Sequence, residues 1–158
     1  LAWVDRVSSV AGRTGAVTLA ESDITGLVSD LAAKLDDSQL ALVGFSQGSM
    51  MALHVGLRRK IAPAAILSYS GVLVGPEHLS EATARNSRGE TPPVLLVHGD
   101  RDDVIPPEAL FMTNDALAGA GIPCQWHLSP GVGHGIDGGG LMQGGLFLAH
   151  SFGLPIPA

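Results

Sequence analysis

Apolar residues form two kinds of pattern that alternate along this chain from residue 40 onward. One kind is a short, nearly continuous apolar run, which is typical of a strand buried on both faces of a sheet. Four such runs lie at residues 40–43, 64–69, 93–97 and 124–128. We therefore predict a sheet of about four strands in this part of the chain.

The segments between these runs carry apolar residues at helical spacing. In the first segment, Met50, Leu53 and Leu57 follow a 3.6-residue period, and the basic residues 58–60 suit a helix C-terminus. The predicted helices are residues 47–60, 76–85, 107–118 and 141–150, the last of which is rich in glycine. Buried strands that alternate with helices predict an α/β fold, with a parallel sheet flanked by helices.

Residues 1–38 have a different pattern and are predicted to be separate from residues 39–158. Small and β-branched residues are punctuated by Gly12 and Gly15, and apolar residues at helical spacing follow Asp23. This pattern predicts a short hairpin followed by an amphipathic helix that Asp23 caps.

Composition narrows the class of protein. The 158 residues are 46% hydrophobic and 15% charged, which is typical of a globular domain. A net charge of -6 disfavours nucleic acid and anionic membranes as partners. We expect no membrane span, no signal peptide, and neither a metal nor a cofactor, because no run or cluster has the required length or spacing. The single cysteine, Cys124, suits a reducing, cytoplasmic setting.

Candidate chemistry begins at residues 44–48, which read G-F-S-Q-G between the first predicted strand and the first predicted helix. This is the pattern of a nucleophile elbow, in which the central serine sits on a sharp turn with its hydroxyl exposed. We expect positions 44 and 48, both glycine, to require small residues because strand and helix nearly touch there. Ser46 is therefore the predicted nucleophile.

A serine nucleophile needs a histidine base and a carboxylate that orients it. The third predicted strand leads into H-G-D-R-D-D-V-I-P at residues 98–106, and the fourth leads into G-V-G-H-G at residues 131–135. Parallel strands bring both loops to the same edge of the sheet. Asp100, Asp102 and Asp103 are the candidate acids, and His134 is the candidate base. Structural roles are expected for His54, His98 and His127, and surface or packing roles for His78 and His150.

In combination, G-F-S-Q-G, H-G-D-x-D-x-x-x-P and G-H-G resemble the phospholipase/carboxylesterase branch of the α/β-hydrolases, which includes acyl-protein thioesterase-like enzymes. The resemblance covers residues 40–157 and implies a partial α/β-hydrolase that lacks the N-terminal strands. It assigns the nucleophile to Ser46, the acid to Asp102 and the base to His134. It implies a serine hydrolase that cleaves short- to medium-chain carboxylic esters, thioesters or lysophospholipids through an acyl-enzyme.

One part of this implied site is incomplete. The backbone N–H of Gln47 is expected to supply one oxyanion-hole donor, whereas the second donor comes from a loop upstream of the elbow, and no H-G-x-G-like segment precedes Gly44. An open edge on the first strand would favour homo-oligomers. The alternative interpretation is a catalytically incompetent hydrolase half that acts as a binding or fibre-linked interaction module.

Residues 7–27 read V-S-S-V-A-G-R-T-G-A-V-T-L-A-E-S-D-I-T-G-L. Residues 7–35 resemble a module of bacteriophage tail fibres, which implies a trimeric shaft or adaptor without catalysis. Such a chain would join two unrelated pieces near residues 36–39.

Overall fold

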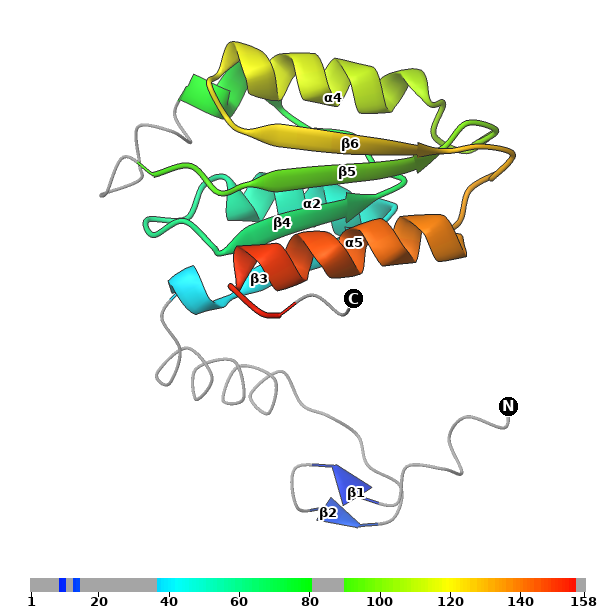
Figure 1. The fold of residues 1–158 in the computed structure, drawn as a ribbon. Helices are drawn as coiled ribbons and strands as arrows, with labels where there is room; N and C mark the ends of the chain where they lie inside the picture. Colours follow the sequence, from blue (N-terminus) through cyan, green and yellow to red (C-terminus); the bar gives the residue numbers. More distant parts are fainter. Residues whose placement is uncertain (1–8, 11–12, 15–36, 81–89, 156–158) are drawn as a thin grey trace. The chain divides into compact units, whose positions relative to one another are not determined.

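The computed structural model describes residues 9–10, 13–14, 37–80 and 90–155. Within them, four strands form a parallel sheet in the order β3-β4-β5-β6 (Figure 1). Each strand begins within one residue of its predicted position, so the predicted α/β sheet is confirmed. The strands are β3 (Ala41–Phe45), β4 (Ala65–Tyr69), β5 (Val94–Gly99) and β6 (Cys124–Ser129).

Helices cover both faces of this sheet, as Figure 1 shows. They are α2 (Gln47–Gly56), α4 (Glu108–Gly119) and α5 (Gly138–Ser151). Strand side chains alternate between the two faces, so each face has its own apolar core. The core on the α2 and α4 side includes Leu53, Ile66, Val94, Leu96, Leu110 and Leu117, and the core on the α5 side consists of Ala65, Leu67, Tyr69, Leu95, Val97 and Phe147.

The last helix is longer than its sequence pattern predicts. α5 begins at Gly138 because the carboxylate of Asp137 accepts hydrogen bonds from the N–H groups of Gly139 at 3.1 Å and Gly140 at 3.0 Å. This is an N-cap, and it satisfies donors that a helix start leaves free. The same carboxylate accepts a hydrogen bond from the Ser129 hydroxyl at 2.7 Å, which ties the helix start to the end of β6.

Glycines bring α5 close to the sheet. A Cβ at Gly140 would come within 2.9 Å of Val97 Cγ1, and a Cβ at Gly144 would collide with the Tyr69 hydroxyl. These residues weaken a helix in isolation, but they let this one lie directly on β4 and β5.

Two other predicted helices differ from the structure. α2 ends at Gly56 rather than at residue 60, and a Cβ at Gly56 would lie 2.6 Å from Ile66 Cδ1, so the helix end packs tightly on β4. Residues 76–85 are predicted to be helical; Pro76–His78 forms a 3₁₀ turn, η3, after a left-handed Gly75, and residues 79–80 are α-helical. A second 3₁₀ turn, η2, spans Asp37–Gln39, and residues 81–85 lie outside the described residues.

The chain divides into two compact units, Leu1–Asp36 and Asp37–Ala158. In the first unit, β1 (Ser9–Val10) and β2 (Arg13–Thr14) pair antiparallel, with Ser9 opposite Thr14. The amphipathic helix predicted after Asp23 lies outside the described residues. The assignment of residues 1–38 and 39–158 to unrelated domains stays a prediction.

Candidate active site

Ser46 occupies the turn between β3 and α2, with φ 53° and ψ -122°. A non-glycine residue with positive φ is uncommon, and such strain persists only where the surroundings hold the turn. The N–H of Ser46 donates to the carbonyl of Tyr69 at 2.9 Å, so the turn is tied to the end of β4. The turn therefore has the sharp, strained form that the sequence motif predicts.

The two glycines beside this turn have different roles. A Cβ at Gly44 would collide with the backbone of Gly48 and Ser49, so strand and helix do meet there. A Cβ at Gly48 would meet nothing within 4 Å in the described part of the chain. The expectation that both positions must be small is thus wrong for Gly48, because its backbone, rather than its missing side chain, lies at the close approach.

His134 lies on the loop between β6 and α5 and faces Ser46. Its Nε2 is 3.0 Å from the Ser46 Oγ, and its Nδ1 is 2.8 Å from Asp102 Oδ2. An ionised carboxylate only accepts hydrogen bonds, so Nδ1 carries the proton that is donated to Asp102. In the neutral ring Nε2 is then the acceptor, and it is positioned to receive the Ser46 hydroxyl proton.

Asp102 lies on the loop after β5, and its side chain has no exposed surface. Its Oδ1 accepts hydrogen bonds from the N–H groups of Val104 at 3.0 Å and Ile105 at 2.9 Å. Burial by itself raises the pKa of this carboxyl, but the hydrogen bonds from His134, Ile105 and Val104 outweigh burial and lower the pKa from its ordinary value of 3.8. Asp102 is therefore ionised at neutral pH and held in one orientation.

This lowered pKa makes part of the folding stability depend on pH. The unfolded chain takes up the Asp102 proton at a higher pH than the folded chain does, so the contribution of the carboxylate is fully present above 3.8 and is lost as the pH falls through the lower folded pKa. Urea unfolding from about pH 7 to about pH 3 should therefore show the wild type losing its advantage over Asp102→Asn at the acidic end. A difference that stays constant throughout would contradict this assignment.

The neighbouring aspartates have other surroundings. Asp100 Oδ1 accepts a hydrogen bond from the N–H of Gly131 at 2.6 Å, which links the β5 and β6 loops. Asp103 is exposed. Of the three candidate acids, the structure brings only Asp102 within hydrogen-bonding distance of His134.

Two contacts of the histidine loop were not anticipated from the sequence. The ring of Phe45, the variable residue before Ser46 in the elbow motif, lies 4.9 Å from the His134 ring between centroids. The Ser70 hydroxyl donates to the carbonyl of Gly135 at 3.3 Å, and Ser70 has a positive φ of 46°. Positive φ at a buried serine has no local sequence signal. Only the fold therefore shows that the residue after β4 forms a hydrogen bond to the loop that carries His134.

Gln47 is the first residue of α2, where the hydrogen-bond ladder of the helix leaves backbone N–H groups free. Its N–H is therefore a candidate oxyanion donor beside Ser46, and the described residues identify no second donor.

Burial raises the pKa of the Cys124 thiol to about 11, so this cysteine is a poor nucleophile at neutral pH.

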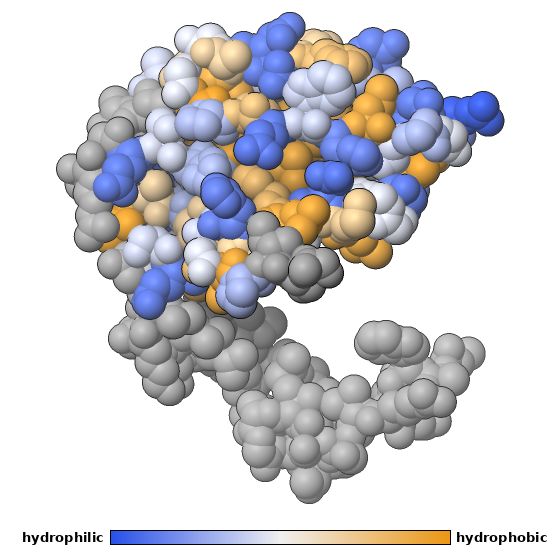
Figure 2. All heavy atoms as spheres, in the orientation of Figure 1, coloured by the Kyte–Doolittle hydropathy of each residue, from blue (hydrophilic) through white to orange (hydrophobic). Residues whose placement is uncertain are grey.

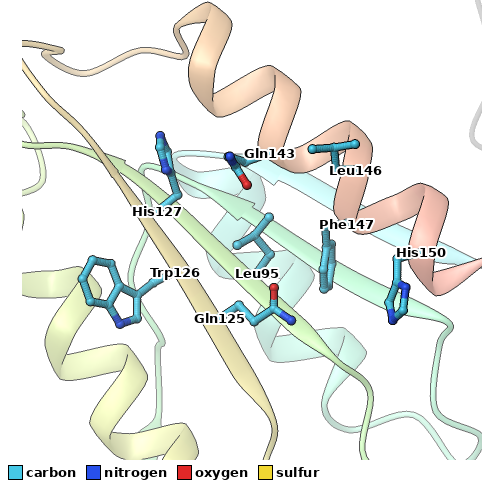
Figure 3. A pocket seen from close by; sticks show the side chains of 8 residues that line it. All are labelled: Leu95, Gln125, Trp126, His127, Gln143, Leu146, Phe147 and His150. Carbon is cyan, nitrogen blue, oxygen red and sulfur yellow. The ribbon is translucent and has the colours of Figure 1, made fainter. Parts of the chain in front are cut away.

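The face that carries α5 has apolar side chains exposed among polar ones (Figure 2). A groove of about 350 Å³ lies there between β6 and α5, and it is separate from Ser46, Asp102 and His134. Figure 3 shows its polar side chains on both elements. Its lining consists of Leu95, Gln125, Trp126, His127, Gln143, Leu146, Phe147 and His150.

Among the described residues, no three histidine, cysteine, aspartate or glutamate side chains are grouped so that they could hold a metal ion. In the same part of the chain, no helix has both the length and the apolar character needed to cross a bilayer.

A parallel sheet with a strained serine after one strand, and a carboxylate and a histidine on the loops after two later strands, is the arrangement of an α/β-hydrolase. Solved structures of this class match the chain. It is 40% identical to esterase PE8, with a TM-score of 0.70 over 82% of this chain and 59% of that one. The match to Zea mays acyl-protein thioesterase 2 has 22% identity and a TM-score of 0.64 over 86% and 70% of the two chains, and it shows the fold.

Within that class, the model of the phospholipase/carboxylesterase family matches residues 16–151, and the chain belongs to this family. It is also 30% identical over 96 residues to acyl-protein thioesterase 1 of Gibberella zeae. That alignment covers 61% of this chain and 41% of the relative, so the chain spans about two fifths of that protein. The family match begins inside residues 1–38, and the tail-fibre resemblance of that segment stays a prediction.

Proposed function

We propose that this chain carries the catalytic centre of a serine hydrolase for short- to medium-chain carboxylic esters, with thioesters and lysophospholipids as related substrates. The observation that carries the proposal is the continuous contact from Ser46 Oγ to His134 Nε2, and from His134 Nδ1 to Asp102, at 3.0 and 2.8 Å. The esterase and thioesterase names of the relatives support the substrate class.

The geometry suits a two-step reaction. Ser46 Oγ attacks the acyl carbon while His134 Nε2 takes the hydroxyl proton, and His134 then gives that proton to the departing alcohol or thiol. A water molecule, activated by the same nitrogen, attacks the acyl-enzyme and releases the carboxylic acid. Asp102 keeps the Nδ1–H tautomer and stabilises the imidazolium that forms in each step.

The negative charge that develops on the acyl oxygen is stabilised by the N–H of Gln47 and by the N-terminal end of α2. One missing donor typically costs about 10²- to 10³-fold in kcat. The rate of this chain therefore depends on whether a second donor reaches Ser46.

The chemistry needs only an ester and water, so the proposed partner is a small-molecule ester, without metal or organic cofactor. We expect a cytoplasmic setting, in keeping with the single free cysteine.

The test is labelling with a fluorophosphonate, which reacts covalently with activated serines. Wild type is expected to be labelled, and Ser46→Ala should lose the label. Ser49→Ala is the matched control and should keep it, because the Ser49 hydroxyl is buried in α2, without a hydrogen-bond partner in the described part of the chain. Folded wild-type protein that takes up no label contradicts the proposal.

The second candidate function is an interaction module that associates through its sheet edge. Among the described residues β3 pairs with β4 alone, and its Val43 and Phe45 side chains are 52% and 40% exposed. An open strand with exposed apolar side chains favours pairing with another chain, a second copy included. Absence of labelling in folded protein, together with association in sedimentation experiments, would favour this function.

A further inference from the structure

A second histidine faces the carboxylate of Asp102. His98 Nε2 lies 3.3 Å from Asp102 Oδ2, the same oxygen that is 2.8 Å from His134 Nδ1. His98 is 2% exposed, so water does not compete freely for this contact. The Asp102 carboxylate is thus contacted by two histidines and by two backbone N–H groups.

The direction of the His98 contact follows from its other partner. His98 Nε2 is also 2.9 Å from the carbonyl oxygen of Ile105. A carbonyl oxygen only accepts hydrogen bonds, so Nε2 must carry the proton. The Nε2–H therefore donates to Ile105, and the same nitrogen lies 3.3 Å from Asp102 Oδ2, so the positive end of a buried N–H dipole lies beside the negative carboxylate.

His98 also links the loop that carries Asp102 to strand β5. It belongs to β5, which pairs with β4 and β6, whereas Asp102 lies on the loop that follows. The N–H of Ile105 donates to Asp102, and the carbonyl of Ile105 accepts from His98. Both polar groups of the Ile105 backbone therefore hold the loop in place.

We propose that His98 is a positioning residue that fixes the orientation of the Asp102 carboxylate from strand β5, and thereby the orientation and tautomer of His134. The inference rests on the proposed hydrolase function and assigns a role that the sequence pattern left as structural. His98 acts on Ser46 only through Asp102 and His134, so it affects the chemical step rather than substrate binding.

The test compares His98→Gln with His98→Met, which have similar length and volume but differ in having an N–H donor. His98→Met is expected to lower kcat for an activated ester by about 10- to 100-fold, with KM nearly unchanged, because it removes both the hydrogen bond to Ile105 and the N–H beside the Asp102 carboxylate. His98→Gln should recover most of that loss. Equal losses in both variants would overturn the proposal.

A double-mutant cycle separates positioning from a general effect on folding. In an Asp102→Asn background, His98→Met should cause little further loss of kcat, because the group through which it acts is already altered. A full, additive loss in that background overturns the proposal.

A measurement on the wild type needs neither activity nor a variant. ¹H–¹⁵N NMR of the imidazoles should show the His98 proton on Nε2 and the His134 proton on Nδ1. A His98 ring with its proton on Nδ1 alone overturns the inference, even if the fluorophosphonate labels Ser46. The converse outcome is that the NMR shows the expected proton positions while the fluorophosphonate fails to label Ser46. That combination contradicts the hydrolase function and supports the His98 geometry.

Discussion

Replacing His134 with alanine is expected to lower kcat for an activated ester by roughly 10⁴- to 10⁶-fold, as much as the loss of Ser46. The reason is that Ser46 Oγ lies 3.0 Å from His134 Nε2, which is its proton acceptor in the proposed mechanism. Without that base, the serine must attack with its proton still bound. The measurement is the steady-state hydrolysis of a short-chain p-nitrophenyl ester.

A double variant tests whether the effects of the two substitutions on kcat are non-additive. In the proposed mechanism Ser46 and His134 act as one unit, so the Ser46→Ala, His134→Ala double variant should be no slower than either single variant. His127→Ala is the matched control, since that histidine lines the separate groove between β6 and α5. A His127→Ala variant as slow as His134→Ala would contradict the assignment of the base.

Gly44→Ala is expected to destabilise the unit Asp37–Ala158 by more than about 3 kcal/mol. The reason is that the new Cβ would collide with backbone atoms, which no side-chain rotation can move away. Total stabilities are about 5–15 kcal/mol, so a loss of this size removes much of the folded population. The collision involves the backbone of Gly48 and Ser49, at the start of α2. Urea unfolding followed by circular dichroism measures the effect.

The matched control is Gly48→Ala, on the other side of the same motif. A Cβ there meets nothing within 4 Å among the described residues, and alanine favours helices over glycine by up to about 1 kcal/mol. We therefore expect Gly48→Ala to fold at least as stably as the wild type. Equal destabilisation by the two substitutions would show that the close approach of β3 and α2 is not what Gly44 permits.

The sequence predicted that Ser46, Asp102 and His134 lie close together, because each of them has a local signal. Ser46 lies in a five-residue motif, and Asp102 and His134 each follow a buried strand. A parallel sheet brings the ends of such strands to one edge, so the fold class alone implied that the three loops converge.

Features that depend on tertiary contacts were not predicted. The start of α5 was missed because residues 138–140 are all glycine, and propensity alone opposes a helix there. The Asp137 cap and the closeness of Gly140 to Val97 override that propensity. Likewise, the contact of His98 with Asp102 depends on the folding of the loop back onto β5, which spacing along the chain does not reveal.

The raised pKa of Cys124 makes this thiol a built-in reporter of local unfolding. The chain has one cysteine, at the first position of β6, and its pKa of about 11 keeps the thiolate scarce while the strand is folded. Alkylating reagents attack the thiolate, so they modify Cys124 more slowly in the folded chain than in the unfolded chain. A change that loosens β6, whose C-terminal end leads into the His134 loop, is therefore expected to raise the rate of alkylation.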